Sequence, residues 1–246
     1  MLYLFLNPSA FVLRGIMKKI VMLLILAAAG VYFLLVAKPS LYYSQSLEYK
    51  NFTLRFRGAA PERVDVALDN ALAKITASEF FTPDTKFDIY LPGGRSEFLV
   101  FTAFQSGAYS RINPFTGAVF IAAADFKSDQ ARTAPGAPAT RVLGLEIAGA
   151  AGREMMRRKV KPLTYISMGE WKLRGYAEKL SGGNGIFKPA DICTGDAKDP
   201  DLLDYKYGLA VEFAMKEDGL SFPELMDKEY KYEGLEERMK KITCGG

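Results

Sequence analysis

Four glutamates between residues 146 and 178 are the side chains of this sequence best suited to acid–base chemistry. Paired carboxylates can act as a general acid and a general base. Glu146 and Glu178 lie in short motifs on two expected helices, L-E-I-A-G over residues 145–149 and R-G-Y-A-E over residues 174–178. Glu154 and Glu170 lie in no such motif, and we expect them on solvated helix faces.

The chain contains no histidine. Imidazole is the commonest ligand of catalytic zinc and the commonest general base near neutral pH. The serines that precede Gly107 and Gly182 therefore lack a histidine base, and neither lies in a nucleophile elbow. Most hydrolytic mechanisms are excluded on this ground.

Helical spacing and capping residues predict the elements that position the two motifs. We expect one helix from Thr140 to about Lys159, and another over residues 171–181 that ends at Gly182-Gly183. Four more helices are expected, over residues 61–75, 202–217 and 232–242 and from Ser221 onward. Residues 96–104 form either a short helix capped by Ser96 or a strand.

The first half of the chain also contains strand patterns. We expect strands over residues 47–57, 86–91, 107–112 and 117–122, the last two joined around Asn113-Pro114. A connector rich in proline and alanine, residues 132–140, separates this half from a helical second half. The predicted fold class is α/β (α+β), a small mixed sheet with flanking helices followed by a C-terminal helical half.

The N-terminal segment is apolar. Residues 20–37 carry no charge, which is close to the shortest run that spans a bilayer. A cleaved signal peptide has a shorter apolar region, and a cut after residue 29 would leave an apolar mature terminus. We therefore expect an uncertain extension over residues 1–16, a signal anchor or transmembrane helix over 17–38 with its basic flank in the cytoplasm, and an exported domain over 46–246.

The charge of the chain gives no case for nucleic-acid binding. The formal net charge is +4, and Arg14, Lys18 and Lys19 near the N-terminal apolar run account for three of these charges. About +1 remains for the rest of the chain, so we expect no nucleic-acid partner.

The two cysteines, Cys193 and Cys244, are too few for a disulfide framework. They form either one bridge, which would close a loop of about 50 residues, or two unpaired thiols. Sequence spacing does not decide between these alternatives.

Residues 140–182 resemble the gluzincin-type zinc metallopeptidases. That family combines H-E-x-x-H with a tryptophan–leucine segment leading into E-G-x-A-E. Here Trp171, Leu173 and the G-Y-A-E run of residues 175–178 keep the frame. The resemblance is specific over residues 141–182 and loose over the rest of 47–239. It implies a zincin-like fold in which two crossing helices surround a cavity.

Every metal ligand of that pattern is replaced in this chain. Leu145 and Gly149 stand at the two histidine positions, and Arg174 stands at the carboxylate ligand. Leucine and glycine cannot coordinate zinc, and arginine repels it. The resemblance therefore implies no bound metal, no cofactor and no catalysis, with Glu146 as a vestige of the catalytic glutamate.

Arg174 offers a positive charge near the position of the missing cation. We expect its guanidinium to pair with Glu146 or Glu178 and to substitute for the metal. The alternative is that Arg174 points to solvent and Glu146 is an ordinary helix residue.

Together these features favour a membrane-anchored, catalytically inactive metallopeptidase-like protein that binds peptide or protein at the cell envelope. Residues 117–122 are the expected edge strand to which an extended peptide would add. One alternative is a hydrolase or peptidase with a non-standard carboxylate or metal site, and another is a structural envelope protein.

Overall fold

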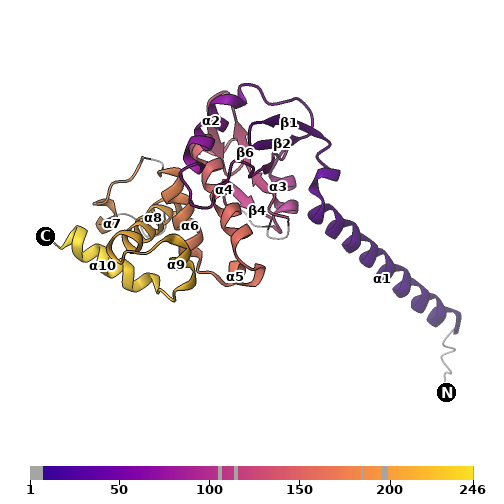
Figure 1. Ribbon diagram of the computed structural model, residues 1–246. Helices are drawn as coiled ribbons and strands as arrows, with labels where there is room; N and C mark the ends of the chain where they lie inside the picture. The colour runs from indigo at the N-terminus through magenta and orange to yellow at the C-terminus, as the bar shows by residue number, and fades with distance from the viewer. Residues whose placement is uncertain (1–7, 105–106, 114–115, 184, 195–198, 246) are drawn as a thin grey trace, which may run out of the picture. The chain divides into compact units, whose positions relative to one another are not determined.

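The computed structural model describes residues 8–104, 107–113, 116–183, 185–194 and 199–245 (Figure 1). Contacts between residues divide the chain into two units, Met1–Tyr42 and Tyr43–Gly246. The second unit begins slightly before the expected residue 46, because the buried ring of Tyr43 packs against Tyr90 and Phe101.

The first unit contains helix α1 (Pro8–Ala37) and the short 3-10 helix η1 (Pro39–Leu41). The part Met17–Ala37 has a mean hydropathy of 2.8, and its large apolar side chains are mostly exposed. This helix is long and apolar enough to cross a membrane, and it fits a transmembrane or signal anchor.

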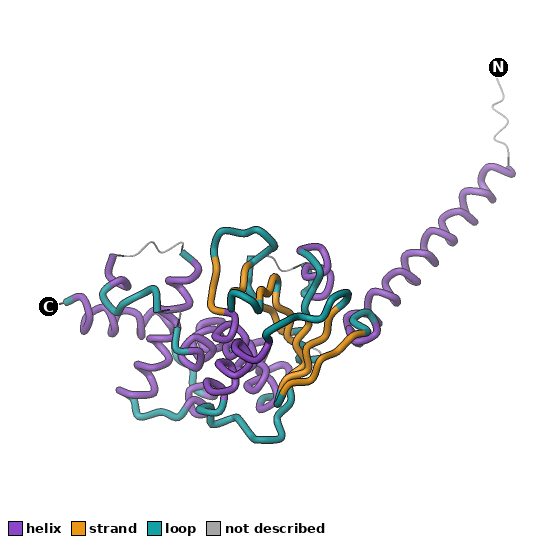
Figure 2. Tube along the Cα trace, turned by 90° about the horizontal axis from the view of Figure 1, so that it is seen from above, coloured by secondary structure: helices purple, strands orange, loops and turns teal. Residues whose placement is uncertain are grey.

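The second unit is a mixed α/β fold, in which the strands gather on one side and most helices on the other (Figure 2). Its larger sheet has five strands in the order β1-β2-β3-β5-β4. The β2–β3 and β3–β5 pairs are parallel, and the β1–β2 and β4–β5 pairs are antiparallel. The strands are β1 (Gln45–Tyr49), β2 (Phe52–Phe56), β3 (Phe87–Tyr90), β4 (Ser110–Ile112) and β5 (Val119–Ile121).

Two predictions about this sheet were wrong. Residues 47–57 form a hairpin of two strands, because Lys50 adopts a left-handed backbone conformation that reverses the chain. The two edge strands are β1 and β4, and β5 lies inside the sheet between β3 and β4. The expected turn at Asn113-Pro114 lies partly outside the described residues.

A second sheet replaces part of the expected connector. Strands β6 (Ala123–Asp125), β7 (Gln130–Arg132) and β8 (Thr140–Val142) pair antiparallel in that order. Residues 132 and 140, the two ends of the proline-rich stretch, are partners in the β7–β8 register. The following helix therefore begins at Leu143 and not at Thr140.

The helices of the second unit largely match the sequence pattern. Helix α2 begins at Val64, three residues after Pro61, because Arg63 has a left-handed conformation. Two short helices, α5 and α7, were not expected. The helices are α2 (Val64–Ile75), α3 (Arg95–Phe101), α4 (Leu143–Lys159), α5 (Pro162–Ser167), α6 (Glu170–Ser181), α7 (Asp191–Thr194), α8 (Pro200–Glu217), α9 (Phe222–Asp227) and α10 (Tyr232–Cys244).

Small residues let the central helices approach closely. Helix α4 packs between α2 and α6, and α6 packs in turn against α8. A Cβ atom on Gly149 would lie 3.4 Å from the carbonyl oxygen of Ala177, and one on Gly175 would lie 2.3 Å from the carbonyl oxygen of Tyr207. Glycine at these positions brings the two motif-bearing helices and α8 together.

Gly175→Ala is expected to destabilise the second unit by roughly 2 to 3 kcal/mol, because the new methyl group overlaps backbone atoms of α8 that cannot rotate away. Urea unfolding followed by the fluorescence of the single tryptophan, the buried Trp171, measures this loss. Gly234→Ala in α10 is the matched control, since no atom lies within 4 Å of its Cβ position. The control should be neutral or slightly stabilising. Equal effects of the two substitutions would contradict the close α6–α8 packing.

Cys193 and Cys244 form a disulfide with a Cα–Cα distance of 5.9 Å. The bond links α7 to the end of α10. Sequence spacing left open whether the two cysteines form a bridge or two unpaired thiols, and the structure shows the bridge.

Candidate functional site

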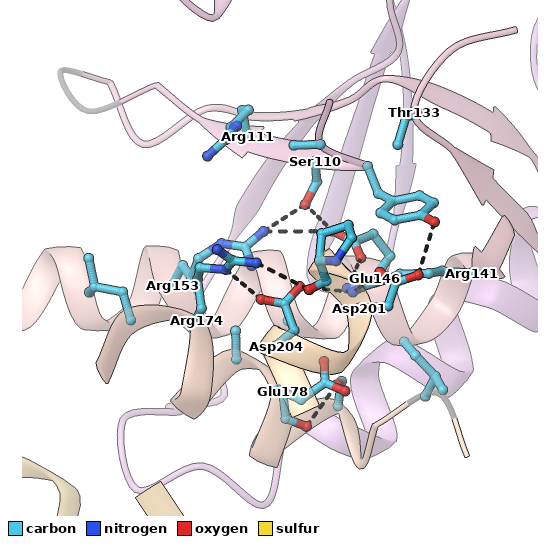
Figure 3. A pocket seen from close by; sticks show the side chains of 18 of the residues that line it. Ser110, Arg111, Thr133, Arg141, Glu146, Arg153, Arg174, Glu178, Asp201 and Asp204 are labelled. Atoms are coloured by element: carbon cyan, nitrogen blue, oxygen red, sulfur yellow. Dashed lines mark hydrogen bonds and ion pairs between the residues drawn. The ribbon is translucent and has the colours of Figure 1, made fainter. Parts of the chain in front are cut away.

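A cavity of about 640 Å³ opens between the edge strand β4, helices α4 and α6, and the first turn of α8 (Figure 3). All five positions singled out from the sequence lie in its wall: Leu145, Glu146 and Gly149 from α4, and Arg174 and Glu178 from α6. The two motifs, separated by 25 residues from Gly149 to Arg174, thus contribute to one site.

Glu146 is buried and held by three partners. Its carboxylate accepts a hydrogen bond from Ser110 Oγ on β4 and from Arg141 Nη1 at 3.3 Å. Arg153, two turns along α4, lies 3.7 Å from the same carboxylate and donates to Ser110 Oγ at 2.6 Å. Glu146 is therefore neither an exposed helix residue nor a free base.

The expected pairing of Arg174 with Glu146 or Glu178 needs correction. Arg174 pairs with Asp204 on α8 and, at 3.0 Å, with Glu170 one turn earlier on α6. Its guanidinium also stacks over the ring of Tyr207 at 5.5 Å. Helix α8 packs directly against α6, so Asp204 on α8 pairs with Arg174 in place of Glu146 or Glu178.

The cation surrounded by carboxylates is Arg141. Its side chain is 9% exposed and contacts Glu146, Asp201 and Asp204, the last at 2.8 Å. The guanidinium also lies 4.8 Å from the centre of the Tyr109 ring. Although burial opposes the charge, these carboxylates raise the pKa of Arg141, so the side chain stays charged.

Sequence reasoning missed Arg141, Asp201 and Asp204. Arg141 precedes helix α4 in strand β8, so helical spacing gives no sign that it faces Glu146. Asp201 and Asp204 lie three residues apart at the start of α8. That i,i+3 spacing places two side chains on one helix face, which was the available signal.

Glu178 differs from the other carboxylates of the cavity. Burial raises its pKa to about 7, with the charges of Asp204 and Glu146 adding to the shift and that of Arg141 opposing it. No hydrogen bond or ion pair of its carboxyl group joins it to another described residue. Glu178 is therefore largely protonated below neutral pH and able to exchange a proton near it.

The raised pKa of Glu178 predicts a pH-dependent stability. The folded state holds a proton that the unfolded state releases near pH 4.5, so the free energy of unfolding should fall as pH rises from about 4.5 to about 7. The full shift corresponds to roughly 3 kcal/mol. Glu178→Gln cannot ionise and should be more stable than the wild type at pH 8 and of similar stability at pH 4. Urea unfolding at both pH values measures the difference, and a variant that loses stability at pH 8 would contradict the assignment.

No group of three or more cysteine, aspartate and glutamate side chains in the described part of the chain is arranged to hold a metal ion. Three carboxylates of the cavity, those of Glu146, Asp201 and Asp204, contact a guanidinium group instead. Leu145, Gly149 and Arg174 supply no ligand atoms for a cation, and the face of α4 that continues from Gly149 brings Arg153 into the same wall.

The remaining sequence candidates lie outside the cavity or contribute little to it. Glu154 does not lie on a solvated helix face as expected, because it is buried and pairs with Arg157 at 2.6 Å and Arg158 at 2.7 Å near the end of α4. Glu170 lines the cavity but is largely exposed. Ser106, the serine that precedes Gly107, lies outside the described residues.

No protein-family model, curated protein or solved structure matches this chain. The fold and the site define a mixed α/β protein with an N-terminal apolar helix and a cavity in which arginines and carboxylates alternate.

Proposed function

We propose that this chain is a membrane-anchored, catalytically inactive metallopeptidase-like protein that binds an extended peptide at the cell envelope. The observation that carries the proposal is the convergence of the 145–149 and 174–178 motifs on one cavity beside the edge strand β4. The cavity volume, about 640 Å³, suits several peptide side chains.

The edge strand supports a binding mode by strand addition. Strand β4 pairs with β5 on one side only, and all three of its residues, Ser110–Ile112, line the cavity. An extended peptide could pair with this edge while its alternate side chains enter the cavity. Residues 117–122, the edge predicted from the sequence, do not serve this role because β5 is interior.

The charges in the cavity support binding without hydrolysis. In a zinc hydrolase the metal polarises water for a glutamate base. Here Arg141 provides the positive charge beside Glu146, and a guanidinium has no open coordination position for water or substrate. Glu146 also contacts Ser110 and Arg153, so its carboxylate is held by neighbouring side chains of the cavity wall.

The disulfide supports an exported domain. Disulfides persist in oxidising compartments, and Lys18 and Lys19 on the N-terminal side of the apolar run favour retention of that end in the cytoplasm. In cells, Cys193 and Cys244 should resist a membrane-permeant maleimide until a reductant is added. Labelling without reductant would place the domain in a reducing compartment.

Selection from a synthetic peptide library by the full chain in neutral detergent tests the binding function. We expect a defined set of bound peptides. Ala139→Trp should abolish their capture, because this exposed alanine lies at the cavity wall and the indole would fill the opening. Ala77→Trp, at an exposed position outside the cavity, is the matched control and should bind normally. Equal capture by both variants would contradict binding in this cavity.

A second candidate function is a hydrolase that uses carboxylates. Glu178 favours it, because a carboxyl group with a pKa of about 7 in a cleft suits general acid–base work. This alternative predicts cleavage products from the same library and their loss in Glu178→Gln. A structural envelope protein, the third candidate, predicts neither capture nor cleavage.

A further inference from the structure

One arginine of the cavity forms no ion pair with any residue that the structure describes. Arg111, in the middle of strand β4, lines the cavity, and its Nε atom is buried without a hydrogen-bond acceptor. No carboxylate among the described residues lies within ion-pair distance of its guanidinium. Each of the other three cavity arginines, at positions 141, 153 and 174, pairs with at least one carboxylate.

The surroundings of Arg111 are themselves positive. Burial and the nearby charges of Arg153 and Arg174 lower the pKa of Arg111, and Glu170 and Asp204 offset this effect only in part. Arg153 and Arg174 lie together at one end of the cavity, away from Arg141 (Figure 3). A buried donor that lacks an acceptor lowers the stability of the folded state. The Nε atom of Arg111 therefore has this cost unless a ligand accepts its hydrogen bond.

We propose that Arg111, flanked by Arg153 and Arg174, binds a carboxylate group of the peptide, either its C-terminus or an acidic side chain. This inference rests on the proposed peptide-binding function. A guanidinium presents its donors in a planar fork that matches the two oxygens of a carboxylate. Arg111 is on the edge strand, so a peptide that pairs with β4 would bring such a group directly to it.

The charge balance favours a singly charged group. One guanidinium is unpaired, whereas the carboxylates of Glu146, Asp201 and Asp204 already stand in the same cavity. A phosphate would add a second negative charge to a cavity that already holds these carboxylates, and like charges within one cavity repel each other. A peptide carboxylate balances Arg111 without that excess.

Titration of the full chain in neutral detergent tests this site. The probes are acetyl-trialanine with a free carboxylate, the same peptide as its amide, acetate, and inorganic phosphate. Calorimetry measures affinity, and the Nε–Hε resonance of Arg111, assigned by its loss in Arg111→Gln, reports binding at the site. We expect the free-carboxylate peptide to move this resonance and to bind at least tenfold more tightly than the amide.

Arg111→Gln should weaken binding of the free-carboxylate peptide at least tenfold, while its melting temperature stays equal to or above that of the wild type. Arg95→Gln, which removes an exposed arginine outside the cavity, controls for net charge and should bind normally. A lower melting temperature with unchanged affinity would make Arg111 a structural residue and overturn the proposal.

The remaining outcomes separate this site from the peptide function. Equal affinity for carboxylate and amide peptides with an unmoved Arg111 resonance would refute the carboxylate site and leave peptide binding intact. A resonance that moves with acetate but with neither peptide would retain the anion site and refute the peptide function. A stronger response to phosphate than to carboxylate would overturn the ligand assignment, and no response to any probe would overturn the site.

Discussion

Arg141→Met is expected to destabilise the second unit by roughly 3 to 5 kcal/mol, the cost of removing one partner from a buried ion pair. Methionine keeps much of the apolar volume but leaves Glu146, Asp201 and Asp204 without their shared cation. Arg153 and Arg174 compensate in part, which favours the lower end of this range. Urea unfolding at pH 7, followed by the fluorescence of Trp171, measures the loss.

Two comparisons distinguish a charge effect from lost packing. The deficit of Arg141→Met should shrink near pH 4, where the orphaned carboxylates can take up protons. Arg174→Met removes a guanidinium from the same cavity but should cost less, because Arg174 and its partner Glu170 are more exposed. A deficit of Arg141→Met that is the same at both pH values would show that packing, and not charge, makes Arg141 important.

Loss of the disulfide is expected to have an effect of similar size. Cys193 and Cys244 are separated by 51 residues, and closing a loop of that length is worth roughly 4 kcal/mol in the chain-entropy model. The double variant Cys193→Ser/Cys244→Ser should therefore unfold at a clearly lower urea concentration. The double variant avoids the lone thiol that a single substitution would leave.

The reductant provides the control for this prediction. Adding it should lower the stability of the wild type to that of the double variant and leave the variant unchanged. The loss should concern the α7–α10 region most directly, because these two helices carry the cysteines. A wild type that keeps its stability under conditions that fully reduce the bond would contradict the expected contribution.

The sequence predicted the helices and the strand segments of the larger sheet, but it missed the order of those strands and the second sheet, for physical reasons. Helices α4, α6 and α8 each contain several turns of regular spacing, and Gly182 has the left-handed conformation expected of a helix end. Strands β6, β7 and β8 of the second sheet have three residues each, too few for an alternating pattern. Which strand lies at the edge depends on contacts between distant segments, so a local pattern cannot supply it.

The candidate site was predicted in position but not in charge pairing. The resemblance of residues 140–182 implied two helices at one cavity, and the structure places both motifs in the wall of one cavity. The partner of each charge was set by α8 and β8, whose side chains enter the cavity from outside the two motifs. For this reason the arginine that contacts Glu146, Asp201 and Asp204 is Arg141 and not Arg174.

The most direct test of the central claim compares binding and cleavage of library peptides by the full chain with a chelator present and with zinc added. The cavity is proposed to bind peptide through its own arginines and the edge of β4. We therefore predict equal affinity under both conditions and recovery of the bound peptides intact by mass spectrometry. Binding that requires zinc, or cleavage that appears when zinc is added, would contradict the account.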